Sequence, residues 1–263
     1  MTHPQNNQAR HFRALHRPGN PLVLANVYDA ATAAVVATNP SAQAIATASY
    51  AIAGTHGVED NSMSKEINLN AVATIIRHVQ TIDPTKPITV DIQDGYGSTP
   101  AELASTIKDL IALGAVGCNL EDNNNATGTL RPFDEAVERV RVAVAAAREA
   151  GVPDFAVNAR TDLLGDAGAT IDDAIERGKA FLDAGAHTVF IWGPNNRGVS
   201  RDEVRRFSAA LNGMVNVKLS FGPGFLTVPE LRELGVARIS VGPELYRAAM
   251  KAFTDLSTQL LAA

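Results

Sequence analysis

The chain has 263 residues, of which 46% are hydrophobic and 19% charged, and a formal net charge of −5. This composition predicts a globular protein, and the absence of a Pro/Gly/Ser linker or charge block predicts a single domain over residues 1–263. The lack of a basic run excludes nucleic acid as an expected partner. The N-terminus is polar, no apolar run approaches the roughly 20 residues of a membrane span, and Cys118 is the only cysteine, so we expect a cytoplasmic protein without membrane contact, disulfides or a thiolate zinc site.

The predicted elements begin with a helical pattern in residues 1–20, QARHFRALHR, which we expect to form an N-terminal extension that packs against one end of the domain. Short apolar runs follow it. They lack strict alternation, which is expected for parallel strands that are covered on both faces. The predicted strands are residues 21–27, 43–49, 87–92, 115–120, 155–159, 187–192, 214–219 and 237–241.

Helical stretches separate these strands, and several of the stretches end in a glycine just before the next strand. Gly114, Gly151, Gly185 and Gly235 fit the position after a helix, where the backbone is left-handed. Eight such units in one domain favour a closed (β/α)8 barrel, the TIM barrel, over an open doubly wound sheet. The less favoured alternative is a Rossmann-like sheet, because NVYDAATAA after the first strand lacks the G-x-G-x-x-G turn of a dinucleotide site.

Four predicted strand ends are unusually polar, and in a barrel they would meet at the carboxyl-terminal mouth, where catalytic groups lie. Carboxylates that converge there repel one another unless a cation neutralises them. Oxygen ligands without thiolates or paired imidazoles favour Mg²⁺ or Mn²⁺. The polar residues, from the second to the fifth strand, are Ser49, Tyr50, His56 and Asp60; Asp91, Gln93 and Asp94; Asn119, Glu121 and Asp122; and Asn158, Arg160 and Asp162.

Arg160 carries a fork of donors that matches a carboxylate or phosphonate, and together with a metal it would stabilise an enolate. Structural alternatives remain for some of these residues. Arg160 could instead brace a neighbouring carboxylate, and Asp94, Asp122 and Asp162 could cap the helices that follow them. Asp91 is harder to explain structurally, because an unpaired carboxylate at the end of an apolar strand is costly to bury.

Six segments together resemble the isocitrate lyase and phosphoenolpyruvate mutase superfamily: NVYDAATA, SYAIAGTHGVED, VDIQDGYG, NLEDNN, VNARTD and ARISVGPELYRAA. The resemblance implies a Mg²⁺- or Mn²⁺-dependent barrel that makes or breaks carbon–carbon or carbon–phosphorus bonds next to an α-oxo acid through an enolate-type intermediate. It also implies a homodimer or homotetramer that exchanges its last helix, for which residues 244–261 are the candidate.

The same resemblance assigns roles to individual residues. The predicted metal-binding residues are Asp91, Glu121 and Gln93, the predicted substrate-binding residues are Ser49, Tyr50, Asp91 and Arg160, and the predicted catalytic residues are Arg160 and Asp60. The substrate carboxylate is expected to bind backbone amides at Ser49 and Tyr50.

Two departures from the family pattern narrow the function. Gln93 stands where the family has a second acidic residue, which removes one negative charge and is expected to weaken metal binding. Residues 122–132, DNNNATGTLRP, lack the K-[KR]-C-G-H loop whose cysteine serves as an acid in isocitrate and methylisocitrate lyases, so a true isocitrate lyase is not expected. The favoured prediction is a carbon–carbon lyase or decarboxylase of an α-oxo or α-hydroxy (di)carboxylate. The alternatives are a phosphoenolpyruvate mutase or phosphonopyruvate hydrolase, and a non-catalytic barrel that binds an α-oxo acid.

Overall fold

The computed structural model describes residues 4–166, 168–193 and 198–262, and its centre is a ring of parallel strands. The strand order is β1-β11-β10-β9-β8-β5-β4-β3-β2, and all pairings within this sheet are parallel. The strands are β1 (Leu22–Leu24), β2 (Asn26–Val27), β3 (Ile45–Thr47), β4 (Ile88–Asp91), β5 (Gly117–Glu121), β8 (Ala156–Thr161), β9 (Thr188–Ile191), β10 (Val215–Lys218) and β11 (Arg238–Ser240).

The first predicted strand closes this ring. It is divided by Ala25 into β1, which pairs with β11, and β2, which pairs with β3. The first and the last strand of the sheet order, β1 and β2, are therefore consecutive in the chain, and they close the sheet into a barrel. The predicted TIM barrel is confirmed. Every strand that was expected from an apolar run is present, although most are shorter than the run.

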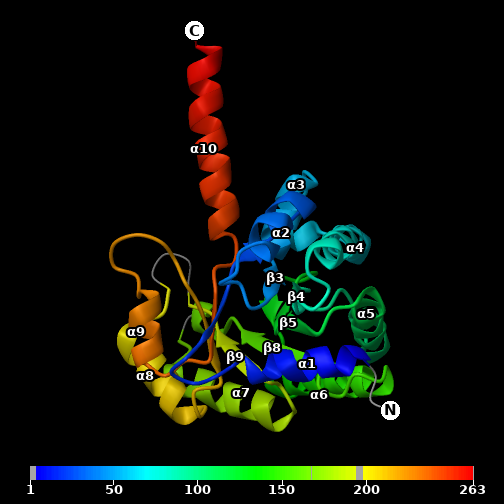
Figure 1. Cartoon of the computed structure of the whole chain (residues 1–263). Helices are drawn as coiled ribbons and strands as arrows, with labels where there is room; N and C mark the ends of the chain where they lie inside the picture. The colour runs from blue at the N-terminus through cyan, green and yellow to red at the C-terminus, as the bar shows by residue number, and fades with distance from the viewer. Residues whose placement is uncertain (1–3, 167, 194–197, 263) are drawn as a thin grey trace.

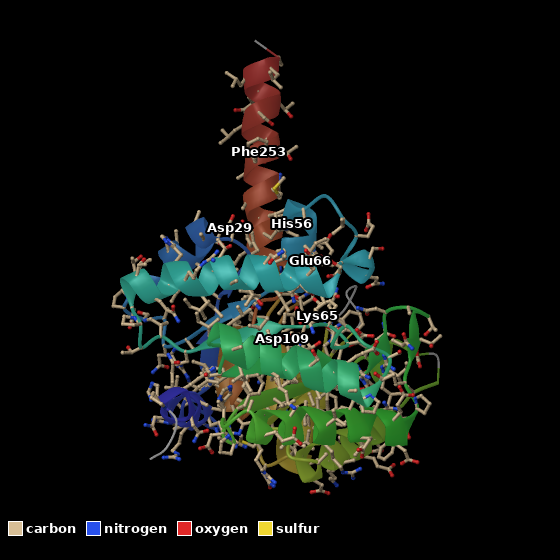
Figure 2. All side chains as sticks on the ribbon, turned by 90° about the vertical axis from the view of Figure 1, so that its right-hand side faces the viewer. Asp29, His56, Lys65, Glu66, Asp109 and Phe253 are labelled. Atoms are coloured by element: carbon tan, nitrogen blue, oxygen red, sulfur yellow. The ribbon has the colours of Figure 1, made fainter. Side chains whose placement is uncertain are left out.

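Helices surround the barrel in the order expected of β/α units (Figure 1). Capping boxes at Thr99 and Thr170 begin two of them, and Gly114, with a φ of 108°, ends the first of these in the left-handed conformation that was predicted. The outer helices are α2 (Ala30–Ala37), α4 (Lys65–Ile82), α5 (Pro100–Leu113), α6 (Phe133–Glu149), α7 (Ile171–Asp183), α8 (Arg201–Ala210) and α9 (Val228–Glu233). Figure 2 shows α4 and α5 side by side, where Lys65 and Asp109 form an ion pair of 2.7 Å.

Helix α1 (Pro4–Ala14) packs beneath the barrel, at the end opposite the carboxyl ends of the strands. Phe12 is completely buried. A Cβ atom at Gly117 would lie 3.0 Å from its ring and 2.7 Å from the backbone oxygen of Ala156, so β5 needs a glycine there. The side chain of Gln5 donates hydrogen bonds to the carbonyl oxygens of Ile111 and Ala115. These contacts fix α1 against the ends of α5 and β5.

Helix α10 (Glu244–Leu261) extends away from the barrel and buries none of its residues (Figures 1 and 2). Its exposed apolar side chains include Met250, Phe253, Leu256 and Leu260, which are 43% to 76% exposed. Exchange of this helix between subunits stays a prediction. None of the helices in the described ranges is long and apolar enough to cross a membrane.

Candidate active site

A cavity of about 160 Å³ opens at the carboxyl-terminal mouth of the barrel. Five of the predicted site residues line it: Ser49, Tyr50, Asp60, Asp91 and Arg160. Glu121 and Gln93 do not line it. Strands β2, β9, β10 and β11, the loop after β9 and the start of α10 supply further lining residues, among them Asn26, Phe190, Trp192, Asn216, Lys218, Arg238, Ser240 and Arg247.

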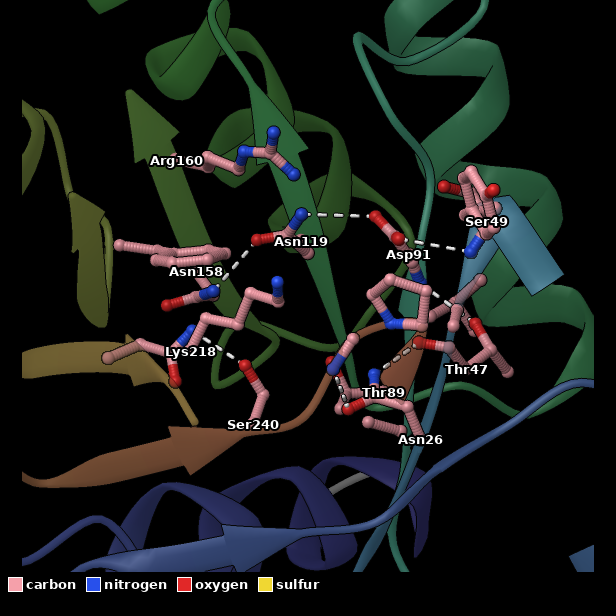
Figure 3. A pocket seen from close by; sticks show the side chains of 18 of the residues that line it. Asn26, Thr47, Ser49, Thr89, Asp91, Asn119, Asn158, Arg160, Lys218 and Ser240 are labelled. Atoms are coloured by element: carbon pink, nitrogen blue, oxygen red, sulfur yellow. Dashed lines mark hydrogen bonds between the residues drawn. The ribbon is translucent and has the colours of Figure 1, made fainter. Parts of the chain in front are cut away.

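Asp91, the last residue of β4, is held by donors on both of its carboxylate oxygens. Its Oδ2 accepts a hydrogen bond from the backbone N–H of Ser49, and its Oδ1 accepts one from Nδ2 of Asn119, both at 3.0 Å. Behind Asn119, Asn158 donates to its amide oxygen (Figure 3), and Thr188 donates to that of Asn158. This chain of donors is directed at Asp91, and it leaves each carboxylate oxygen with a free lone pair for a ligand.

Ser49 and Tyr50 begin helix α3 (Ser49–Thr55) beside Asp91. Ser49 is buried and its backbone N–H is already bonded to Asp91. Tyr50 is 41% exposed, and the guanidinium of Arg247 lies 5.0 Å from its ring centre. Tyr50 therefore lies at the rim with the start of α10, and binding of a substrate carboxylate by the two backbone amides stays a prediction.

Asp60 lies in a short 3-10 helix (η1, Asp60–Ser62) at the mouth, and Gln93 holds it there. Nε2 of Gln93 donates to both the backbone oxygen and Oδ1 of Asp60 at 2.7 Å, and its Oε1 accepts from Nδ2 of Asn125. Burial, followed by the negative charge of Asp91, raises the pKa of Asp60. Both ends of the Gln93 amide thus bind protein groups, and the side chain does not line the cavity, so these contacts favour a positioning role for Gln93 over the predicted metal role.

The hydrogen bonds between Gln93 and Asp60 predict how restoring the acidic residue of the family at position 93 affects stability. We expect Gln93→Glu to lower the free energy of unfolding by about 2 kcal/mol, because it replaces a donor to Asp60 by a second carboxylate. Without added Mg²⁺, urea unfolding should show a smaller loss at about pH 5 than at about pH 8, since acid protonates one of the two carboxyl groups. Gln93→Met, which removes the donor without adding charge, is the control. Equal stability of Gln93→Glu and the parent would place residue 93 away from Asp60.

Arg160, on β8, is bound by two carboxylates and packed against two aromatic rings. Its Nε and Nη2 donate to the two oxygens of Asp162 at 2.5 and 2.8 Å, and its Nη1 donates to Oε1 of Glu121 at 2.8 Å. The rings of Phe190 and Trp192 lie 5.4 and 5.3 Å from the guanidinium carbon. A guanidinium has five N–H bonds, so one on Nη1 and one on Nη2 remain for a ligand. Arg160 therefore braces Glu121 and Asp162, and its two remaining N–H bonds are compatible with binding of a substrate carboxylate.

Glu121 lies behind Arg160 at the end of β5. Burial raises its pKa well above the usual range, the positive charge of Arg160 opposes this, and the negative charges of Asp162, Asp91 and Asp60 add to it. Four carboxyl groups therefore lie close together at the mouth of the barrel, and Arg160 is the positive charge that opposes the rise in the pKa of Glu121. A cation placed there would relieve their repulsion.

A hard cation such as Mg²⁺ requires oxygen ligands. Within the described ranges there is no group of three or more histidine, cysteine, aspartate or glutamate residues that could hold a metal ion. Magnesium, however, usually takes one or two protein carboxylates and keeps several waters. Asp91 in the cavity, with Asp60 nearby, fits a hydrated Mg²⁺ or Mn²⁺ ion, whereas Glu121 is engaged by Arg160.

Asp94 and Asp122 do not cap helices, and that alternative is wrong for them. Asp94 accepts from Nη2 of Arg131 at 3.0 Å, and Asp122 accepts from Nη1 of Arg177 at 2.9 Å, all four residues being buried. The helices α5, α6 and α7 begin instead after Thr99, Pro132 and Thr170. Asp162 makes no side-chain cap bond either, because both of its oxygens bind Arg160.

The segment after β5 forms a short hairpin from β6 (Asn123–Asn124) and β7 (Thr129–Leu130). Arg131, at its base, ties the hairpin to Asp94. No lysine, cysteine or histidine occurs in it. The hairpin therefore offers no side chain of the kind that the methylisocitrate lyases are expected to use as an acid.

Sequence reasoning missed the residues of β2, β10 and β11 that face the barrel interior. They are polar residues within apolar strand runs: Asn26 in PLVLANV, Asn216 and Lys218 in MVNVKL, and Arg238 and Ser240 in ARISV. A polar residue inside a doubly covered strand was the signal that could have found them.

Comparison with known proteins agrees with this geometry. The family model described as phosphoenolpyruvate phosphomutase matches residues 12–261. The chain belongs to the phosphoenolpyruvate mutase and isocitrate lyase superfamily. Members of this superfamily are lyases and mutases, and the predicted resemblance is confirmed.

Individual superfamily members are similar over different shares of the chain. The 2-methylisocitrate lyase of Escherichia coli (strain K12) is 34% identical over 187 residues, which cover 68% of this chain and 60% of that protein. That of Salmonella typhimurium (strain LT2) is 30% identical over 259 residues, 93% of this chain and 83% of the other. The crystal structure of a 2,3-dimethylmalate lyase has a TM-score of 0.83 and 25% identity, and the match covers 97% of this chain and 85% of that one.

Proposed function

We propose that this superfamily member is a Mg²⁺- or Mn²⁺-dependent lyase or decarboxylase. It would cleave a carbon–carbon bond of an α-oxo or α-hydroxy dicarboxylate through an enolate-type intermediate. The observation that carries the proposal is Asp91, a carboxylate fixed by Ser49 and Asn119 with free lone pairs in a cavity that Arg160 also lines. A divalent cation at Asp91 would act as a Lewis acid on the α-oxo or α-hydroxy group of the substrate.

The protein's own residues supply binding and a proton. The remaining N–H bonds of Arg160 offer a charge-assisted contact to the substrate carboxylate, and Phe190 and Trp192 shield that contact from water. Asp60, whose pKa is raised by burial and by Asp91, is suited to hold and deliver a proton at Oδ1 or Oδ2. Gln93 fixes the position of that carboxyl group.

A 2-methylisocitrate lyase and a 2,3-dimethylmalate lyase are among the similar proteins, which favours carbon–carbon chemistry. The second candidate is carbon–phosphorus chemistry on phosphonopyruvate, and it is supported by the description of the family model itself. The hairpin without a cysteine, lysine or histidine argues for a substrate other than the methylisocitrate of the bacterial relatives.

A substrate panel tests the proposal. The full chain is incubated with Mg²⁺ or with EDTA and with substituted malates, oxaloacetate or phosphonopyruvate, while α-oxo acid, carbon dioxide and inorganic phosphate are measured. We expect Mg²⁺-dependent cleavage of a dicarboxylate without phosphate release. Phosphate release from phosphonopyruvate alone would support the second candidate. Mg²⁺-dependent binding of oxalate with no turnover of any compound would indicate the non-catalytic barrel.

A further inference from the structure

Arg238, the first residue of β11, is a cation inside the barrel that none of the proposed steps uses. It lines the cavity and is only 3% exposed. Its Nε and Nη1 have no hydrogen-bond partner among the described residues. Burial lowers its pKa to about 10, with smaller opposing effects from Cys118 and Asp91, so it stays protonated at neutral pH.

Each of the other cations of the cavity has a carboxylate partner. Arg160 is paired with Glu121 and Asp162, and Lys218 lies 2.9 Å from Glu244. Arg247 is also paired with Glu244, at 3.2 Å. No ion pair of Arg238 occurs in the part of the chain that the structure describes.

The position of Arg238 places it deep in the cavity. In the parallel pairing of β10 and β11, Asn216 is opposite Arg238 and Lys218 is opposite Ser240. The pair of Lys218 and Ser240 is nearer the mouth of the barrel, and the pair of Asn216 and Arg238 forms the layer below it. Residues two apart on a strand share a face and are about 7 Å apart. Thr89, another cavity residue, has an Oγ1 without a hydrogen-bond partner. The floor thus holds a cation and a hydroxyl group, and none of its lining residues below Asp91 is acidic.

An unpaired buried cation is costly, and it persists when a ligand compensates it. A carboxylate is the counter-ion that fits a guanidinium fork. We propose that Arg238 binds the second carboxylate of the substrate at the floor of the cavity and so selects dicarboxylates over monocarboxylates. This inference rests on the proposed function, in which the first carboxylate binds Arg160 and a cation is held by Asp91.

Calorimetric titration in the presence of Mg²⁺ tests the inference with three ligands. Malate and 2-hydroxybutyrate share an α-hydroxy acid end and differ in a distal carboxylate against a methyl group, whereas oxalate has no distal group. The parent protein should bind malate at least about tenfold more tightly than 2-hydroxybutyrate, the value of one charge-assisted contact. Arg238→Met should remove this preference and change the affinity for oxalate by less than about twofold. Lys218→Met, the matched control, should keep the preference because Glu244 already compensates Lys218.

Thermal unfolding of the ligand-free proteins gives a second readout. Arg238→Met should melt at the same temperature as the parent or higher, since it removes an uncompensated buried charge. A lower melting temperature together with an unchanged preference for malate would assign Arg238 a structural role and overturn the inference. If Arg238→Met does not fold, the parent and Lys218→Met still test the inference. It is overturned if the parent does not prefer malate over 2-hydroxybutyrate, or if Lys218→Met loses that preference.

The two proposals fail in different ways. Failure of oxalate to bind the parent in Mg²⁺ would contradict the proposed function itself, whatever Arg238 does. Binding of oxalate without any preference for malate would overturn only the role of Arg238, and leave it as a group that holds internal water.

Discussion

Replacing Asp91 by asparagine should reduce Mg²⁺-dependent turnover by at least about a hundredfold and leave the protein folded. The substitution removes the charge that would hold the cation but keeps the size of the side chain and an acceptor for Ser49 or Asn119. The stability cost should be at most about 1 kcal/mol, because one lost hydrogen bond is offset by weaker repulsion of Asp60. Turnover, Mg²⁺ affinity and urea unfolding are measured on the same preparation.

Asp94→Asn is the matched control for this variant. Asp94 lies three positions further along the chain and is buried, but it pairs with Arg131 instead of facing the cavity. Its loss should therefore destabilise the protein by about 3 kcal/mol and spare the activity of the molecules that remain folded. Metal-dependent turnover that survives in Asp91→Asn, or an equal loss of stability in both variants, would contradict the metal role of Asp91.

Replacing Arg160 by lysine should lower catalytic efficiency on the order of a hundredfold, although the positive charge is kept. An ammonium group cannot reproduce the paired bonds to Asp162 together with the bond to Glu121 and a contact to the substrate. Stability should also fall, by about 2 kcal/mol, because these partly buried carboxylates lose donors. Kinetics and urea unfolding give the two effects separately.

Oxalate titration distinguishes substrate binding from bracing in this variant. We expect Arg160→Lys to weaken oxalate binding in Mg²⁺ at least about tenfold. Asp162→Asn, which loosens the brace and leaves the guanidinium in place, should lose stability with a smaller change in oxalate affinity. Unchanged oxalate affinity in Arg160→Lys would show that Arg160 only braces Glu121 and Asp162.

The barrel could be predicted because its signals are local. Glycines such as Gly114 end helices in the left-handed conformation, and doubly covered strands have continuous apolar runs. The division of the first strand at Ala25 could not be predicted, since it depends on how the closing strand passes from β11 to β3. Closure is a property of all the strands together.

Within the site, Asp91 and Arg160 line the cavity where the sequence placed them, at strand ends, whereas Glu121 lies behind Arg160 and Gln93 follows the end of its strand. Asp91 is the last residue of β4, so the alternation of a strand no longer applies to Gln93, whose φ of 51° turns it toward Asp60. Arg238 was missed for a different reason. In a strand that is covered on both faces, apolar neighbours do not show which side chains face the barrel interior and which face the helices.

A crystal structure of the protein grown with Mn²⁺ and oxalate tests the central claim most directly, because anomalous scattering locates the metal independently of any activity. The account predicts a manganese peak in the cavity beside the carboxylate of Asp91, with oxalate between the metal and Arg160. No manganese in the cavity, or a manganese ion bound elsewhere while Asp91 keeps only its bonds to Ser49 and Asn119, would contradict it.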